Sequence, residues 1–271
     1  MISRNASRIL QPTARRGSRI SILERADVTP AHRDQMFALL DGYYLHASRE
    51  QFESDLAEKQ WVLLGTDGAG DRVHGFTTLM QLGVDVGNVQ VRAFFSGDTV
   101  FESTCWGRAE TSRALGCLLD HMLRTAEREP ESMWYWFMIS STYRSYRLLP
   151  LVFQEFHPSP GCPIPDATGL ILEGLVRKKF GSAYDPRTSI IRYPNPTVFR
   201  SGARASVVDR EDPWERFFLE ANPGHATGDR MASLASLSPD NLTPLGRRLV
   251  GHVSASGVAR RVPSTGLLVA G

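Results

Sequence analysis

Two carboxylates and two tyrosines have the side-chain types that general acid–base catalysis uses. Asp98 lies in Ser96-Gly97-Asp98-Thr99, and Glu102 follows shortly after it. A carboxylate here could take a proton from a nucleophile. Tyr143 and Tyr146, in a Tyr-Arg-x-Tyr-Arg segment, carry phenols of pKa about 10 that could give a proton to a leaving group.

Each of these residues also has a simple structural explanation. Asp98 fits a turn residue that bonds its own backbone, and Glu102 fits a solvated loop charge. The tyrosines fit the start of an amphipathic helix whose rings pack on a sheet.

Other patterns of nucleophiles and metal ligands are absent from the sequence. The seven histidines are scattered without His-Glu-x-x-His spacing, so no metal site is predicted. No Gly-x-Ser-x-Gly segment indicates a serine hydrolase. The three cysteines lack Cys-x-x-Cys spacing, and Cys105 fits a buried free thiol better than a nucleophile. The glycines of residues 65–70 precede a Thr-rich segment rather than a helix, which favours a hairpin turn over a phosphate loop.

The bulk composition is that of a globular chain. Its 271 residues, 42% hydrophobic and 22% charged, suffice to bury a core. The net charge of +2 is uneven, because residues 1–26 hold one acid, Glu24, against Arg4, Arg8, Arg15, Arg16, Arg19 and Arg25. We expect a disordered basic tail at 1–26, with a mitochondrial transit peptide as the alternative. The remainder lacks a basic stripe interleaved with aromatics, so no nucleic-acid partner is expected.

The cellular location is predicted from what the sequence lacks. No window approaches the roughly 18 apolar residues of a membrane span, and no apolar run follows the basic start as a secretory signal requires. Cysteines without a disulfide framework fit a reducing compartment. We therefore expect a cytoplasmic protein without a membrane span.

The expected elements begin with two helices and three strands. Thr29-Pro30 predicts a helix start, and Ser48 with Gln51 predicts a capping box for a second helix. Apolar or alternating segments then predict strands at 61–65, 73–80 and 89–95, with a turn marked by Gly83, Gly87 and Asn88.

A long amphipathic helix is expected at 108–128, followed by an apolar strand at 133–139. That strand has no polar residue in Met-Trp-Tyr-Trp-Phe-Met-Ile, which is typical of a strand covered on both faces. Helical segments at 143–156 and 165–180 and a strand at 189–193 complete the order. The sequence predicts an α/β fold with a mixed, mostly antiparallel sheet and helices on both faces over residues 28–195. Residues 196–271 are expected to form an irregular extension, partly packed on the core, with a disordered end.

This order of elements resembles the Gcn-related N-acetyltransferase (GNAT) superfamily over residues 28–195. In that family a loop of Arg or Gln, two residues, Gly, one residue, then Gly or Ala holds the pyrophosphate of acyl-CoA at a helix N-terminus. Thr104-Cys105-Trp106-Gly107-Arg108-Ala109 lies at the corresponding place. Gly107 and Ala109 match, whereas Thr104 replaces the Arg or Gln. The structural alternative for Gly107 is an ordinary loop-to-helix junction.

The resemblance implies roles for the residues introduced above. Asp98 and Glu102 would be bases for an amine, and Tyr146 or Tyr143 would protonate the leaving thiolate, because Phe153 stands where the family often has its tyrosine. Backbone at Phe95 or Ser96 would hold the carrier arm or the oxyanion. The phosphate groups of the acyl donor would be bound by Trp106, Gly107, Arg108, Ala109 and Arg113.

The implied function is transfer of an acyl group to an amine without a metal. The donor would be acyl-CoA or, given Thr104, the acyl-phosphopantetheine of an acyl carrier protein. The acceptor would be a small molecule or a peptide, with Asp41, Asp55 and Glu58 available to attract a cationic amine. The main alternative is a GNAT-like binding or assembly module without catalysis.

Several segments are similar to a narrower GNAT branch of bacterial natural-product clusters. They are Ser96–Thr99, the Trp106-Gly107 pair, the Tyr-Arg-x-Tyr-Arg segment and Asn222-Pro223-Gly224-His225. Members of that branch resemble fatty-acyl transferases that act on Lys or ornithine side chains of modified peptides. A long acyl chain would then need an apolar channel, for which the candidates are Trp134, Tyr135, Trp136, Phe137 and Phe153; the alternative is that these aromatics form the core.

Overall fold

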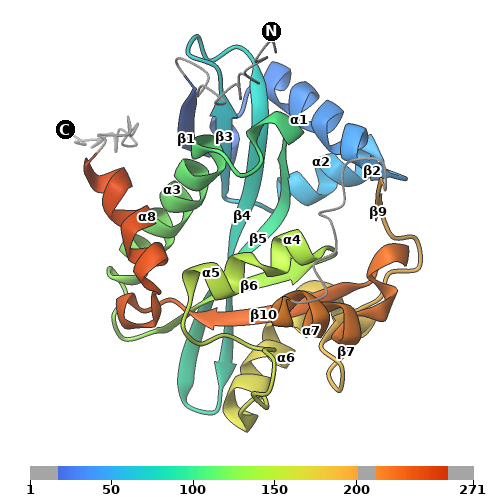
Figure 1. Ribbon diagram of the computed structural model, residues 1–271, viewed down its shortest axis with the longest axis vertical. Coiled ribbons are helices and arrows are strands. Elements are labelled where there is room, and N and C mark those ends of the chain that lie inside the picture. Colours follow the sequence, from blue (N-terminus) through green and yellow to red (C-terminus); the bar gives the residue numbers. More distant parts are fainter. Residues whose placement is uncertain (1–17, 201–211, 256–271) are drawn as a thin grey trace, which may run out of the picture.

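A computed structural model describes residues 18–200 and 212–255 of the chain. Within them one mixed sheet dominates, in the order β1-β3-β4-β5-β6-β10-β8-β7 (Figure 1). Neighbouring strands are antiparallel except β5 and β6, which run parallel. The strands are β1 (Arg19–Glu24), β3 (Trp61–Thr66), β4 (Val73–Val86), β5 (Val89–Phe101), β6 (Met133–Ser140), β7 (Tyr184–Asp185), β8 (Ile190–Ile191) and β10 (Arg230–Ser236). A separate pair joins β2 (Tyr44–Leu45) to β9 (Val198–Phe199).

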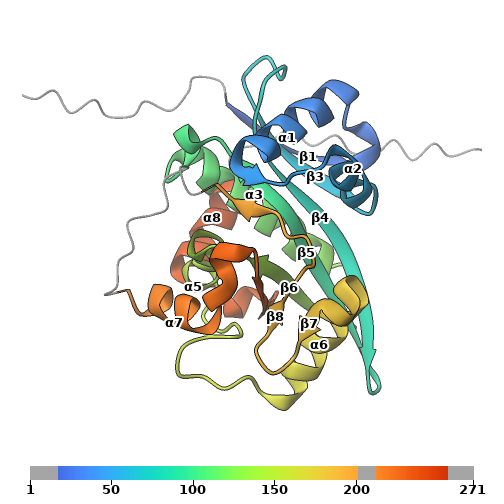
Figure 2. The same cartoon turned by 90° about the vertical axis from the view of Figure 1, so that its right-hand side faces the viewer.

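Helices cover both faces of the sheet, as Figures 1 and 2 show. One face packs against α3 (Ala109–Ala126), α4 (Tyr143–Tyr146), α5 (Leu148–Val152), α7 (Pro213–Ala221) and α8 (Pro244–Ala255). The other face packs against α1 (Pro30–Tyr43), α2 (Arg49–Ala57) and α6 (Asp166–Phe180). β6 lies between these layers, with Trp134 and Trp136 in one core cluster and Tyr135 and Phe137 in the other. The predicted fold class and the predicted central place of this strand are therefore confirmed.

Local signals predicted the helix ends well. The Thr29 hydroxyl accepts a hydrogen bond from the His32 N–H at 3.2 Å and begins α1. The Ser48 hydroxyl likewise accepts from the Gln51 N–H at 3.3 Å and begins α2. Gly181, at φ 58°, ends α6.

The hairpin of β4 and β5 is longer than the sequence predicts. Gly83, expected in the turn, lies inside β4, where a Cβ atom would sit 2.7 Å from Arg92 Nη1. The missing side chain therefore makes room for Arg92 across the strands. β5 also continues past the expected end at Phe95 and reaches Phe101.

Residues 1–17 of the expected disordered tail at 1–26 lie outside the described residues. For Arg19–Glu24 the expectation of disorder is wrong. Arg19–Glu24 form β1 and pair along their whole length with β3. Ile20 is buried beneath α3 and its neighbours, so the apolar residues between the arginines and Glu24 favour a strand despite the basic composition.

The C-terminal segment packs on the core, as expected, but its described part is not irregular, because it adds a strand to the main sheet. β10 pairs with β6 from Met231–Ser140 to Ser236–Tyr135, and α8 packs on α3. The strand sequence Met-Ala-Ser-Leu-Ala-Ser has neither β-branched nor aromatic residues, so local propensity does not reveal it. Small side chains fit here because both faces of β10 are covered.

Candidate functional site

A cleft opens where the parallel strands β5 and β6 part. Their ladder ends at the Ser96–Met138 pair, and beyond it β5 has no β6 partner. On its other side β5 is irregular, with Thr77 opposite Thr99 and Leu79 opposite Ser96. Two residues of β5 thus face one of β4, which is a β-bulge at Gly97-Asp98.

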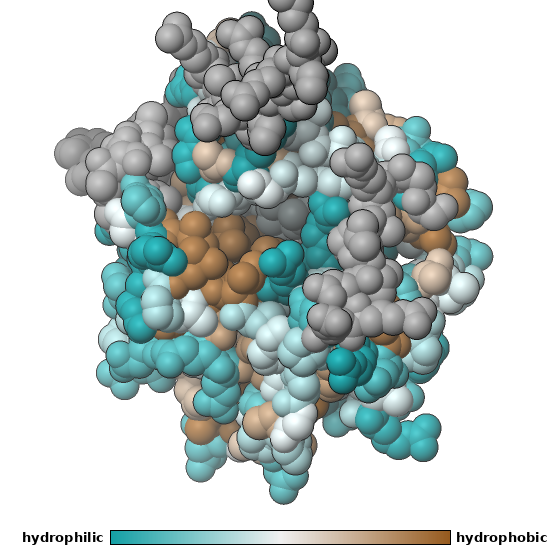
Figure 3. All heavy atoms as spheres, viewed as in Figure 1, coloured by the Kyte–Doolittle hydropathy of each residue, from teal (hydrophilic) through white to brown (hydrophobic). Residues whose placement is uncertain are grey.

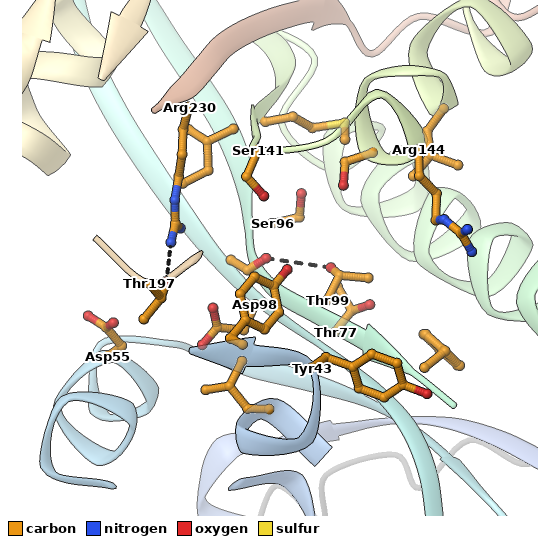
Figure 4. A pocket seen from close by; sticks show the side chains of 18 of the residues that line it. Tyr43, Asp55, Thr77, Ser96, Asp98, Thr99, Ser141, Arg144, Thr197 and Arg230 are labelled. Atoms are coloured by element: carbon orange, nitrogen blue, oxygen red, sulfur yellow. Dashed lines mark hydrogen bonds between the residues drawn. The ribbon is translucent and has the colours of Figure 1, made fainter. Parts of the chain in front are cut away.

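Gly97 is required by close packing under the bulge. A Cβ atom here would lie 2.6 Å from Thr78 Oγ1 and 2.9 Å from Lys59 Cε. The bulge redirects the next side chain, and Asp98 enters the cleft (Figure 4).

The cleft is large, at about 2190 Å³, and runs from Gly107 at one end to Arg230 at the other. Pockets for a single small ligand usually occupy about 300–1,000 Å³. This cleft therefore has room for two reactants, with Asp98 between its ends (Figure 4).

Burial raises the pKa of the Asp98 carboxyl above its ordinary value. Arg230, Lys59 and Lys179 oppose this shift, while Asp55 reinforces it. A carboxylate that keeps a raised pKa among cations is poised to exchange a proton closer to neutral pH than an exposed one.

Tyr44 enters the same part of the cleft from β2. Burial raises the pKa of its phenol, and a hydrogen bond with Ser141, just after β6, acts in the opposite direction. Sequence reasoning did not single out Tyr44, because nothing in the sequence shows that the end of α1 reaches the β5–β6 opening.

The Gly107 end of the cleft lies at the N-terminus of α3. Gly107 has φ 69°, and open space lies where its Cβ would be. The N-cap residue of α3, Arg108, makes no side-chain capping hydrogen bond to the first turn of the helix. The left-handed backbone and this helix end suit an anion that approaches the main chain closely.

Aromatic and cationic groups flank this end. The Trp106 indole N–H donates to the Phe101 carbonyl at 2.8 Å, and the Tyr43 ring packs against the indole at 5.6 Å. The Arg144 guanidinium lies 3.6 Å from the centre of the Trp106 ring. Arg144 and Arg147 both line the cleft. The Tyr-Arg-x-Tyr-Arg segment was thus informative for its arginines, whereas the sequence argument relied on its tyrosines.

A parallel strand pair that parts beside the N-terminus of a long amphipathic helix is the arrangement implied by the resemblance in sequence. The arrangement of these elements agrees with that expectation. No protein-family model matches the chain, and no curated protein sequence matches it.

Solved structures with a similar fold are acyltransferases by their names. A GNAT family N-acetyltransferase from Escherichia coli, in complex with CoA, is 16% identical over 46% of this chain and 63% of its own, with a TM-score of 0.34. A probable N-acyltransferase from Enterococcus faecalis is 10% identical over 81% and 65%, with a TM-score of 0.40. An aminoglycoside 6'-N-acetyltransferase from Enterococcus faecium is 13% identical over 81% and 98%, with a TM-score of 0.36. The chain thus spans just under two thirds of the first two proteins.

The predicted proton donors do not face the cleft with free hydroxyls. Tyr146 is fully buried, does not line the cleft, and donates to the Pro158 carbonyl at 2.9 Å. The Tyr143 side chain borders the cleft, but its hydroxyl donates to the Asp212 carboxylate, and burial and this bond raise its pKa. Each phenol thus donates its proton to a partner inside the protein, and the assignment of either tyrosine as the thiolate acid stays a prediction.

Glu102 is also not placed as a base. Its carboxylate pairs with Arg72 at 2.5 Å and accepts from the Thr104 hydroxyl at 3.3 Å. It does not line the cleft, because the strand end directs it toward β4. Of the two predicted bases, Asp98 is the one that the fold brings into the cleft.

The predicted donor-binding residues divide into two groups. Phe95, Ser96, Trp106 and Gly107 line the cleft. Arg108 and Ala109 begin α3 next to it, where only backbone groups could contribute. Arg113 does not reach the cleft; it donates to the Ser18 carbonyl at 3.4 Å, since it follows the first turn of α3 on the β1 side.

The aromatic segment of β6 is core rather than a channel. The side chains of Trp134, Tyr135, Phe137 and Phe153 are buried and do not line the cleft. Trp136 borders it, but its indole N–H is bound to the Ser96 hydroxyl at 3.0 Å. These rings fill the space between the sheet and the helices, which is the core alternative predicted for them from the sequence.

An apolar groove instead lies between α3, α5 and α8, seen as a continuous brown area in the hollow of Figure 3. We call this the leucine groove. It is part of the same cleft and is lined by Leu115, Leu118, Leu148, Leu151, Leu245 and Leu249.

Over the described ranges, no three His, Cys, Asp or Glu side chains gather where they could hold a metal ion. In the same ranges no helix is long and apolar enough to cross a membrane.

Proposed function

We propose that the protein is an N-acyltransferase that moves an acyl group from acyl-CoA directly to an amine. The observation that carries this proposal is the position of Asp98. It projects from a bulge into the cleft between the parted strands, with an anion-binding helix end on one side and space for an acceptor on the other.

The donor binds at the Gly107 end. Its pyrophosphate lies against the N–H groups at the start of α3, where the helix dipole favours negative charge. Arg144 and Arg147 supply the positive charge that Thr104 lacks. The carrier arm then follows the free edge of β5 at Phe95 and Ser96 toward Asp98.

The reaction is a direct displacement at the thioester carbonyl. Asp98 removes a proton from the amine, the amine nitrogen forms a bond to the carbonyl carbon, and the bond between that carbon and sulfur breaks. CoA leaves as a thiolate. A thiol has a pKa of about 8.5, so the departing sulfur can take its proton from water in the open cleft.

The leucine groove gives the enzyme space for a long acyl chain. Each methylene buried there contributes about 0.8 kcal/mol, or roughly a fourfold gain in affinity. A series of acyl-CoAs from acetyl to hexadecanoyl should therefore bind with increasing affinity in isothermal titration until the groove is filled.

A bulky residue in the leucine groove should remove this gain. Leu249→Trp is expected to weaken binding of the long-chain donors while leaving acetyl-CoA unchanged. Arg248→Trp, at an exposed position of the same helix, is the matched control. Equal affinity for every chain length in the wild type would contradict a long-chain donor.

The test of the function separates binding from chemistry. CoA should raise the thermal unfolding midpoint of the wild type and of Asp98→Asn alike, because a ligand that binds only the folded state stabilises it. Release of the CoA thiol with amine acceptors, small molecules or peptides, should fall by a factor of about 10²–10⁴ in Asp98→Asn.

The alternative is a binding or assembly module that has kept the fold without the chemistry. The Thr104 and Phe153 departures, and the engaged hydroxyls of Tyr143 and Tyr146, favour it. A protein that binds CoA or an acyl carrier protein but transfers no acyl group to any amine would support this alternative. A stabilising effect of an acyl carrier protein without one of CoA would instead identify the carrier protein as donor.

A further inference from the structure

Arg230, the first residue of β10, extends into the cleft on the side away from Arg144 (Figure 4). Its Nη2 donates to the Thr197 hydroxyl at 2.7 Å, and its guanidinium lies 5.2 Å from the centre of the Tyr193 ring. The buried Nε has no hydrogen-bond partner. In the described part of the chain, no carboxylate lies within ion-pair distance of this guanidinium. Arg230 is therefore held in place by neutral groups while its charge remains unpaired.

Asp98 is an opposite charge in the same cleft that does not contact Arg230. The two interact electrostatically, because Arg230 lowers the pKa of Asp98, yet they form no ion pair. Two opposite charges that face one cavity without neutralising each other leave a gap that a ligand bearing both charges can bridge.

The neighbouring lysines have partners inside the protein. Lys59 donates to the Asp55 carbonyl at 2.8 Å and lies 4.0 Å from the Glu58 carboxylate, with which Lys179 also forms an ion pair. Their charges are thus engaged at the wall of the cleft, whereas Arg230 offers its guanidinium to the cavity.

We propose that the amine acceptor also carries a carboxylate, so that the substrate belongs to the amino-acid class, with Arg230 binding the carboxylate and Asp98 facing the amine. This inference rests on the proposed acyl transfer and specifies its acceptor. The amine nitrogen gives its proton to Asp98 and forms the new bond to the acyl carbon, the carbon–sulfur bond breaks, and CoA leaves. The product is an N-acyl amino acid that remains bound to Arg230 through its carboxylate. Arginine suits this role because its planar donors match the geometry of a carboxylate.

Thr197 and Tyr193 act as positioning residues for Arg230. The hydroxyl directs one edge of the guanidinium, and the ring supports its flat face. A guanidinium that is fixed before the ligand arrives loses little rotamer freedom on binding.

The experiment compares acceptors that differ only in the carboxylate. Glycine, β-alanine, 4-aminobutanoate, 6-aminohexanoate and a set of L-α-amino acids are each paired with their primary amides, and CoA release is measured at a fixed acyl-CoA concentration. The wild type should prefer at least one carboxylate over its amide by about 10- to 100-fold in kcat/KM, the range expected for a hydrogen bond to a charged group. The separation of amine and carboxylate in the best acceptor then measures the gap between Asp98 and Arg230.

Arg230→Gln should remove this preference, because the KM for the carboxylate acceptor rises more than the KM for its amide. Arg230 also lowers the pKa of Asp98, so the ratio of kcat/KM between each carboxylate and its amide is the quantity to compare, rather than the absolute rate. Thr197→Val should weaken the preference less. Arg187→Gln, at a 90% exposed side chain outside the cleft, is the control for a lost arginine. Thermal unfolding of each variant shows whether it is folded.

The outcomes separate the inference from the function on which it depends. If amides are acylated as well as carboxylates, or if Arg230→Gln slows all acceptors equally, Arg230 has a structural role and the inference is wrong while the acyltransferase stands. If CoA binds but no amine is acylated, both the proposed function and its acceptor are wrong.

Discussion

Gly107 provides a direct test of how the donor is held. Its φ of 69° lies in the left-handed region, where a residue with a Cβ costs about 1–2 kcal/mol. Nothing lies within 4 Å of the position that a Cβ would take, so no clash adds to this cost. Gly107→Ala should therefore lower the free energy of unfolding by about 1–2 kcal/mol, which corresponds to a decrease of roughly 2–8 °C in the unfolding midpoint.

The same substitution should also weaken CoA binding, because the new methyl group would enter the open space that the phosphate approaches. We expect at least a tenfold loss of affinity in isothermal titration, equivalent to about 1.4 kcal/mol. Gly70→Ala is the matched control: Gly70 has φ 87° and open space at its Cβ position, but lies in the β3–β4 turn outside the cleft.

Gly42→Ala is a second control, because Gly42 lies in α1 with open space around it and no positive φ. This variant should gain up to about 1 kcal/mol. The expected pattern is two destabilised variants, of which one alone loses CoA. Unchanged CoA affinity in Gly107→Ala, or an equal loss in Gly70→Ala, would refute an anion site at the start of α3.

Asp98 and Tyr143 give two further predictions. Because burial raises the pKa of Asp98, the folded protein holds this proton more tightly than the unfolded chain, and stability is lost as the pH rises from about 3.9 through the raised value. Asp98→Asn should thus unfold at a higher temperature than the wild type at pH 7, with the difference disappearing near pH 3; a lower midpoint at pH 7 would contradict the argument. Tyr143→Phe removes the hydrogen bond to the Asp212 carboxylate and should cost about 1–3 kcal/mol in urea unfolding. Its kcat should equal that of the wild type, and a large decrease in kcat would restore Tyr143 as a proton donor.

The sequence predicted those elements whose signals are local. Thr29 and Ser48 cap helices through their own hydroxyls, so the nearby chain contains the whole cause. The uninterrupted apolar run of β6 likewise reports burial on both faces. β1 and β10 were missed because tertiary pairing, rather than propensity, makes them strands.

The candidate site was predicted only in part, and for a related reason. Asp98 and Gly107 lie next to a strand end and a helix start, which sequence patterns can locate. Tyr143 and Tyr146 each directly precede a cleft-lining arginine in the sequence, and only packing shows that their hydroxyls are bound elsewhere. Arg230 comes from a strand that the sequence did not reveal at all.

The late position of β10 has a consequence for protein synthesis. β6 leaves the ribosome about ninety residues before its antiparallel partner β10, as the residue numbers of the two strands show. During that interval the centre of the sheet has an open edge of apolar strand, which can pair with another chain. A nascent or truncated chain that ends before Ser236 is therefore expected to depend on chaperones. The yield of full-length protein should fall when translation is slowed between residues 200 and 236, because the edge of β6 then stays open for longer.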